Sequence, residues 1–589
     1  QMVFPMYVVR VADFQKMTEA RPHQVLKDEG VVMRFATAGA TPAVFISHQW
    51  CGRMHADPHF RQLRVLQAIF KRAAAGNVRM GADFFGAVLF NSRASVRPAD
   101  LQDAMSWVMW YDYFSVPQPE STSPNGQDEE GDHTALENDL GRAVASIASY
   151  VESCSIFMVL APSVPHEDGR FVDYATWMER GWCRFERFSR QLSQSSGQML
   201  LVRGEDRVFE IGPHDYLMDP VGHGVFKVES DKTRLGPIAQ RLLKRKLSAL
   251  YDCGDFEECR SLTSWCTTML DGLPVDWRDA IPTPIFDGGE WLPFRGQGAR
   301  FWGPKPLLVA AGVGDTALLK TILNARADVA CRSSRDTPAY FRYMWQQPLH
   351  IAATCGHLDA ISLLLDHSAC MDAQDFMGKT PLYAAASAGK HLAVERLLNA
   401  RADIHRRDIA SADALHAASI FDRSEVVSLL LARGASSAAN RHCANPLHHA
   451  AMLRGGDVVH MLVSARASLE ERLRPQRYSL VWLVTNAMRF AHYFGAPRFI
   501  SILGENSLGS TPLLCAVMSQ NSRAIKELLR ARADASATNA RGRGALALAD
   551  MCGSSWELLI SEATFTTQCD MSATPSARLG LQLSIVASA

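Results

Sequence analysis

The chain has 589 residues, more than one hydrophobic core usually supports, and this length predicts two to four domains. Apolar residues make up 47% and charged residues 21%, a composition typical of globular domains that excludes a chain dominated by disorder. Because 61 Lys and Arg balance 61 Asp and Glu, the chain has no basic field to attract phosphates, which excludes nucleic acid and anionic membrane surfaces as expected partners.

Two further features of the sequence bear on the compartment. No apolar run approaches the roughly 20 residues needed to cross a bilayer, so no membrane insertion is expected. The 13 cysteines have irregular spacing and form no CxxC pair, which argues against a zinc site and against a secreted disulfide framework. We therefore expect a soluble cytoplasmic protein with reduced thiols and no bound metal.

After an N-terminal extension (1–41), the segment 42–212 alternates short apolar strands with helices. A helix over 58–75 separates the first two strands. The strands are predicted at Pro42–His48, Val108–Phe114, Ser155–Leu160 and Met199–Val202. Alternation of this kind predicts a mostly parallel sheet with helices on both faces. The carboxyl ends of such strands meet at one edge of the sheet, where open α/β folds bind ligands.

Four elements of this segment, in order, resemble TIR domains. Val44–His48 resembles their first strand, Tyr111-Asp112 their second strand with its aspartate, and Ala145–Leu160 the helix and strand that follow. Trp182–Glu186 reproduces a W-C-x-x-E helix signature. The whole arrangement resembles the SHQW-type TIR-like domain found ahead of ankyrin repeats. The resemblance implies an α/β flavodoxin-like fold.

The resemblance also implies two alternative activities. TIR domains either assemble with one another in signalling or cleave NAD, which would then be a substrate, with no cofactor required. In the cleaving members a glutamate contacts the ribose, and the matching residue here is Glu186. His48, Asp112 and Trp182 would line the same nucleotide site. A simpler interpretation stays open, in which Glu186 is an ion-pair partner, Trp182 a core residue and His48 a structural hydrogen-bonder.

Three arginines surround the candidate glutamate in the sequence. Arg180, Arg184 and Arg187 lie within six positions of Glu186. Their positive charges are expected to hold its carboxylate ionised, or simply to pair with it.

Residues 213–304 are interpreted as a connector. Lys232–Leu273 carries apolar residues at helical spacing and predicts two amphipathic helices. The basic run Lys244–Lys246 is either a solvated helix face or a targeting signal. The following junction over 272–306 is rich in Pro, Gly and Trp, and we expect it to be ordered and to pack onto the first repeat.

The segment 305–560 contains a repeated motif of the Thr-Pro-Leu-His kind. Four successive copies, from Gln347–His350 to Asn445–His448, recur at intervals of about 33 residues, a period that resembles ankyrin repeats. The copies begin at Pro306, Pro348, Pro381, Ala414, Pro446, Pro512 and Ala545. About seven units, one or two of them degenerate, predict an all-α solenoid of helical hairpins. Such a fold has no catalytic cleft of its own, so its expected function is to bind a protein partner.

Two steps of the repeat are longer than one period. In the first, from Pro306 to Pro348, the excess falls in the hairpin 331–346. This hairpin carries Tyr340, Phe341, Tyr343 and Trp345, which together with Phe376 are predicted to contact the partner; alternatively, the aromatic residues of the long hairpin cap the solenoid. The later step, from Pro446 to Pro512, covers two periods and predicts a degenerate unit over 478–503. The tail after 560 is expected to be loosely structured.

Two functions follow from these features. The first is an intracellular adaptor that captures a protein through the repeats and relays the event through self-association of the TIR-like domain. The alternative is an NAD-cleaving enzyme that its ankyrin repeats position.

Overall fold

The structure is a computed structural model that divides into two compact units, 1–369 and 370–589, and each is described by itself. It describes residues 2–37, 41–82, 96–118, 130–194, 198–211, 219–283, 286–287, 290–291, 306–333, 346–440, 444–453, 456–474, 506–519 and 521–552. Among these residues, no helix is both long enough and apolar enough to cross a membrane.

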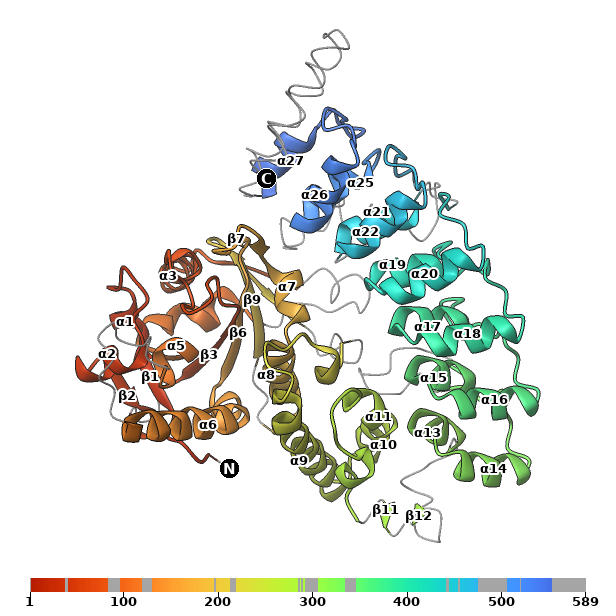
Figure 1. The fold of residues 1–589 in the computed structure, drawn as a ribbon, viewed down its shortest axis with the longest axis horizontal. Helices are drawn as coiled ribbons and strands as arrows, with labels where there is room; N and C mark the ends of the chain where they lie inside the picture. The colour runs from red at the N-terminus through yellow and green to blue at the C-terminus, as the bar shows by residue number, and fades with distance from the viewer. Residues whose placement is uncertain are drawn as a thin grey trace. The chain divides into compact units, whose positions relative to one another are not determined.

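The first unit begins with an eight-stranded mixed sheet of order β2-β1-β5-β3-β6-β9-β10-β4 (Figure 1). The strands are β1 (Tyr7–Arg10), β2 (Val32–Arg34), β3 (Ala43–His48), β4 (Arg79–Ala82), β5 (Val108–Tyr111), β6 (Ile156–Leu160), β9 (Gln198–Gly204) and β10 (Arg207–Glu210). The four predicted strands are confirmed as β3, β5, β6 and β9. They form the parallel centre of the sheet, where the rings of Phe45, Trp110 and Phe157 stack across three neighbouring strands.

The edges of the sheet differ from the expectation of a mostly parallel sheet. β1 pairs antiparallel with β2 and β5, and β10 pairs antiparallel with β9. The segment 1–41 therefore contributes two strands to the sheet. These two short strands, β1 and β2, lie on one side of the four parallel strands, and Val8 and Val9 of β1 are fully buried there. Two small additional sheets pair β7 (Val164–Pro165) with β8 (Phe171–Val172), and β11 (Phe286–Asp287) with β12 (Glu290–Trp291).

Helices connect and cover these strands. They are α1 (Val11–Phe14), α2 (His23–Asp28), α3 (Arg61–Ala74), α5 (Asp112–Ser115), α6 (Glu130–Ser153), α7 (Tyr174–Glu179) and α8 (Gly181–Gln191). The connector helices are α9 (Asp231–Asp252), α10 (Phe256–Ser264) and α11 (Cys266–Met269). The amphipathic pattern predicted for the connector is confirmed by α9, which buries Leu235, Leu243 and Leu247 along one side.

The connector packs onto the first helical hairpins of the same unit. These hairpins are α13 (Pro306–Val313) with α14 (Thr316–Asn324), and α15 (Pro348–Cys355) with α16 (Leu358–Asp366). α10 and α11 contact α13. A Cβ added at Gly312 would lie 2.8 Å from Ser264, so this glycine allows the close approach of α10. Thr267 Oγ1 donates to Gly312 O at 3.2 Å and ties α11 to the same turn.

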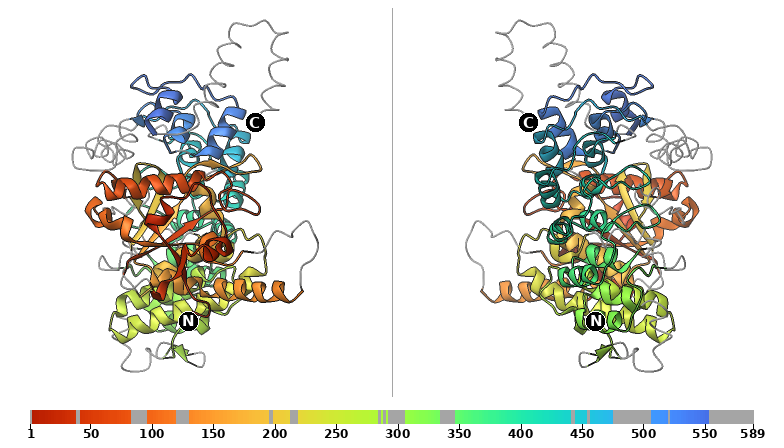
Figure 2. Two further views of the ribbon diagram at one scale, coloured as in Figure 1. Left: turned by 90° about the vertical axis from the view of Figure 1, so that its left-hand side faces the viewer. Right: turned by 90° about the vertical axis from the view of Figure 1, so that its right-hand side faces the viewer.

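The second unit, taken by itself, is also built of helical hairpins (Figure 1 and Figure 2). Its helices are α17 (Pro381–Ala388), α18 (His391–Asn399), α19 (Ala414–Ile420), α20 (Ser424–Ala432), α21 (Pro446–Leu453), α22 (Asp457–Ser464), α25 (Pro512–Ser519), α26 (Ser522–Arg530) and α27 (Ala545–Cys552). The first helix of each hairpin packs on the first helix of the next, from α17 through α19, α21 and α25 to α27. Every predicted unit start is thus the start of a helix.

The sequence of α17 shows why these helices form where they do. Pro381 occupies the first turn, where its missing N–H would have no partner in any case. The Oγ1 atom of Thr380 accepts from Tyr383 N at 3.2 Å and satisfies a free amide of that turn. Gly389 ends the helix at a φ of 76°, in the left-handed region that glycine adopts without strain.

The long step from Pro446 to Pro512 brings two first helices into direct contact. α21 packs against α25, so none of the described hairpins stands between them. His448 Nε2 lies 3.3 Å from Ser510 O across this step. One repeat earlier, His416 Nε2 lies 3.3 Å from Ala444 O in the same way. The predicted degenerate unit over 478–503 lies outside the described residues.

Candidate functional site

Polar side chains gather where β3 and β5 end. These parallel neighbours are in register from Ala43 and Val108 onward, so Ser47 and His48 at the end of β3 meet Asp112, which follows β5. The ends of adjacent parallel strands form the usual ligand crevice of open α/β sheets. The structure therefore brings His48 and Asp112 together, as the sequence predicted.

Asp112 is held by three groups. His48 Nε2 lies 2.6 Å from its Oδ1, Trp50 Nε1 donates to its Oδ2 at 2.8 Å, and Tyr113 N donates to Oδ1 at 2.6 Å. Burial would raise the pKa of Asp112, but the interaction with His48 and these hydrogen bonds outweigh it and place the pKa below its ordinary value. Asp112 is therefore a fixed anion at neutral pH, with 34% of its side chain exposed.

Glu186 reaches the same edge of the sheet from α8. Its Oε2 accepts from Ser47 Oγ at 2.5 Å, and Ser47 Oγ in turn accepts from Trp177 Nε1 at 3.1 Å. Burial raises the pKa of Glu186 to about 8 against the opposing effect of the Ser47 hydrogen bond, and the negative charge of Asp112 adds to the increase. The site thus combines an ionised carboxylate with one that is largely protonated at neutral pH, a pairing often found where acids and bases act.

The expectation that three arginines would hold Glu186 ionised is wrong. Arg184 turns away and donates to Met178 O at 2.6 Å and to Pro220 O at 3.0 Å. Arg187 is buried, with its Nη1 atom 3.1 Å from the sulfur of Met178. Arg180 lowers the pKa of Glu186, but less than burial raises it. The reason is helical geometry, since residues two before or one after Glu186 project from other faces of α8.

Trp182, the third predicted nucleotide contact, makes a different interaction. Its Nε1 donates to Asp231 Oδ2 at 2.8 Å and its ring packs edge-on against Phe185, which ties α8 to the first turn of α9. Two tryptophans that were not predicted as site residues, Trp50 and Trp177, donate to Asp112 and Ser47. Trp50 lies two positions after His48, and its place just beyond the end of the first predicted strand was the signal that could have identified it as a site residue.

The loops before the first helices of the repeats form a second candidate site. Asp375 Oδ1 accepts from Met377 N at 2.8 Å and from Lys379 N at 2.9 Å, and Asp408 repeats this pattern one unit later. Ile409 N donates to Met377 O at 3.0 Å, so neighbouring loops lie side by side. Phe376 and Ile409 are exposed in these loops. The other predicted contacts, Tyr340, Phe341, Tyr343 and Trp345, lie outside the described residues.

Comparisons with known proteins identify the repeats. A family model described as ankyrin repeats (3 copies) matches residues 307–408. The solved ankyrin repeat domain of human ASB11 matches at 24% identity, covering 44% of this chain and 97% of that chain, with a TM-score of 0.34. No curated protein matches the chain. The family match confirms the predicted ankyrin repeats, which generally mediate protein–protein interaction and therefore support a protein-binding role.

Proposed function

We propose that the chain is an adaptor whose ankyrin repeats capture a protein partner. The observation that carries this proposal is the exposure of large apolar side chains in adjacent hairpin loops, 42% for Phe376 and 48% for Ile409. The two residues are one repeat apart in the sequence, and the hydrogen bond from Ile409 N to Met377 O joins their loops. Single exposed apolar residues are ordinary, whereas a pair on joined loops offers a partner one apolar patch.

The rigidity of these loops favours binding. Each aspartate accepts two amides of its own loop, at 2.9 Å for both Ala410 N and Ala412 N in the case of Asp408. A loop that is already ordered loses little conformational entropy when a partner binds. Exposed apolar side chains on such a loop therefore contribute most of their transfer free energy to affinity.

A paired comparison tests the adaptor proposal. Phe376→Ala with Ile409→Ala should weaken binding to a partner isolated with the full chain by roughly tenfold or more, since large hot-spot side chains often contribute ~2 kcal/mol each. Leu392→Ala is the matched control, because Leu392 is 51% exposed at the start of α18, outside the loops. If the double variant and the control lose binding equally, or if neither loses binding, Phe376 and Ile409 have no particular role in binding the partner.

For the N-terminal part we propose a TIR-like domain that relays capture by self-association. The parallel strands lie in the order second, first, third and fourth along the sheet, and this order supports a flavodoxin-like arrangement. Analytical ultracentrifugation of the full chain over a hundredfold range of concentration should detect dimers or larger species. A constant monomer mass throughout would count against self-association.

A second candidate function is NAD cleavage, favoured by the two carboxylates at the sheet edge. In this reaction the bond between the ribose C1′ and the nicotinamide nitrogen breaks, its electron pair neutralises the pyridinium, and water adds to C1′ with release of a proton. Asp112 and an ionised Glu186 would stabilise the positive charge that develops on the ribose. Trp50 and His48 would hold Asp112 in place for that role.

Incubation of the full chain with NAD, followed by chromatography for nicotinamide, tests this candidate. Because Glu186 would act as an anion and burial raises its pKa to about 8, the rate should increase with pH and level off above about pH 8. Glu186→Ala should abolish the release. If the parent releases no nicotinamide at any pH, NAD cleavage is excluded and the adaptor proposal is unaffected.

A further inference from the structure

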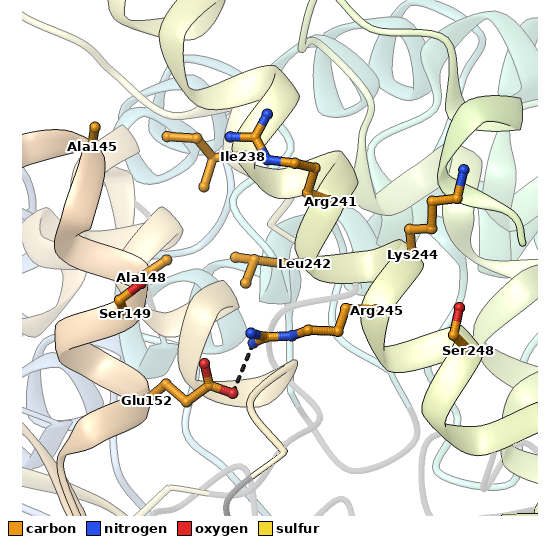
Figure 3. A pocket seen from close by; sticks show the side chains of 10 residues that line it. All are labelled: Ala145, Ala148, Ser149, Glu152, Ile238, Arg241, Leu242, Lys244, Arg245 and Ser248. Atoms are coloured by element: carbon orange, nitrogen blue, oxygen red, sulfur yellow. Dashed lines mark hydrogen bonds and ion pairs between the residues drawn. The ribbon is translucent and has the colours of Figure 1, made fainter. Parts of the chain in front are cut away.

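A groove of about 520 Å³ lies between α6 and α9 in the first unit (Figure 3). The α6 wall consists of small side chains, Ala145, Ala148 and Ser149, followed by Glu152. Ile238 and Leu242 line it from α9. The groove thus combines small and apolar side chains with room for a ligand. None of its lining residues belongs to the cluster of Asp112, Glu186 and their hydrogen-bond partners.

The rim of the groove on α9 is basic. Arg241, Lys244 and Arg245 are spaced by three and four residues, which places them on one face of the helix. Arg245 Nη2 lies 2.7 Å from Glu152 Oε1 across the groove, as Figure 3 shows. For the exposed Arg241 and Lys244, the described residues supply no ion-pair partner. The groove therefore carries an excess of two positive charges beside its apolar lining.

Both walls are anchored to α8, so the groove is preformed. Arg190 of α8 donates from Nη1 to Cys154 O at 2.9 Å, just beyond the end of α6. Trp182 of α8 donates to Asp231 Oδ2 at 2.8 Å, in the first turn of α9. α8 packs against both helices. A ligand that enters the groove therefore does not need to order its walls first, which favours binding.

We propose that this groove binds an acidic amphipathic helix of a protein partner. Its lining runs from Ala145 to Glu152 on α6 and from Ile238 to Ser248 on α9, which is roughly 10 to 15 Å, or two to three helical turns. A partner helix of two to three turns fits this length and can place apolar side chains on Ile238 and Ala145, which are more exposed than the buried Leu242 beneath them. Carboxylates three or four positions apart on that helix then face the basic rim.

The apolar lining decides between a helix and a phosphate ligand. A phosphate or a nucleotide phosphate chain is best held by hydrogen-bond donors on several sides. Here the donors stand on one rim, and the opposite wall consists of alanine methyl groups, Ser149 and the carboxylate of Glu152, which is no phosphate ligand. Of the basic run Lys244–Lys246, Lys244 and Arg245 line the groove and Lys246 does not.

A display library of random 16-residue peptides, selected on the full chain, tests the proposal. Selected peptides should combine apolar residues with two carboxylates three or four positions apart. For the best synthetic peptide, Arg241→Glu with Lys244→Glu should weaken binding at least roughly tenfold, because charge reversal replaces attraction by repulsion. An increase in NaCl from 50 to 500 mM should weaken binding by the parent.

Two further variants separate charge from shape. Lys246→Glu makes a similar charge change outside the groove and should leave affinity unchanged, whereas Ser149→Trp fills the groove without a charge change and should abolish binding. The proposal is wrong if no selected peptide distinguishes the parent from the double variant. It is also wrong if the double variant loses its binding of inorganic phosphate or of phosphatidylserine vesicles while its binding of every peptide is unchanged. Circular dichroism of each variant confirms that it folds.

Discussion

Replacement of Glu186 by Gln should make stability much less dependent on pH in the part of the chain that contains the eight-stranded sheet. In the folded chain burial raises the pKa of Glu186 to about 8, from an ordinary value of 4.5. The folded state therefore keeps its proton between these pH values, where the unfolded state has lost it. Unfolding releases a proton in this window, so the contribution of Glu186 to stability is fully present below about pH 4.5 and is lost as pH rises to about 8.

The magnitude follows from the difference between the two pKa values. A difference of about 3.5, at roughly 1.4 kcal/mol for each pH unit, corresponds to roughly 5 kcal/mol. Glutamine has the shape of the protonated acid and can still accept from Ser47 Oγ, but it never ionises. Glu186→Gln should therefore be within about 1 kcal/mol of the parent at pH 5 and roughly 4–5 kcal/mol more stable at pH 8.5.

Urea unfolding followed by tryptophan fluorescence measures this difference. Nine of the 12 tryptophans precede Pro306, so the signal reports mainly on the N-terminal part. Glu205→Gln is the matched control, because Glu205 is exposed in the turn between β9 and β10. If Glu186→Gln and the parent differ by the same amount at pH 5 and pH 8.5, Glu186 is ionised in the folded chain and the account of its burial is refuted.

Three further predictions concern the repeats. Residues 300–560 should fold alone with a cooperative helical melt by circular dichroism, whereas 348–412, with two units, should not, because each repeat buries its core against its neighbours. Asp408→Ala leaves Ala410 N and Ala412 N without their acceptor and should lower the unfolding free energy of the repeat fragment by about 1–3 kcal/mol in urea. Burial lowers the pKa of His448 to about 4 and that of the neighbouring His449 to about 3, both from 6.5, so the unfolded state gains these protons first on acidification. The loss of stability between pH 6.5 and 4 should be smaller by about 3 kcal/mol in His448→Gln than in the parent, because only His449 still contributes to it in the variant.

The elements that sequence reasoning predicted best have a strong local signal. The four central strands are buried on both faces, so each appears as a short apolar run, such as Ala43–Ile46. Edge strands lack that signal. β4 (Arg79–Ala82) at the edge and its neighbour β10 (Arg207–Glu210) are short and carry polar residues. β10 is a strand because it pairs with β9, and β4 is a strand because it pairs with β10.

The candidate site was predictable in its location but not in its chemistry. Residues at the ends of neighbouring parallel strands must meet, which brought His48 and Asp112 into the prediction. The ionisation of Glu186 could not be predicted, because nearness along the chain suggested Arg184 and Arg187 as neighbours. Their guanidinium groups bond instead to Met178 and Pro220, on other sides of α8.

By itself the sequence determined the repeats, because each ankyrin unit carries its own helix starts, small buried residues and turn glycines at a period of about 33. It likewise determined the central strands, whose burial requires continuous apolar residues. The tertiary structure alone decided that Ser47 rather than an arginine faces Glu186, and that α21 meets α25 although two repeat periods of sequence separate their starts. Local patterns specify elements, whereas the pKa of a buried carboxyl and the neighbours of a repeat depend on groups that are distant in the chain.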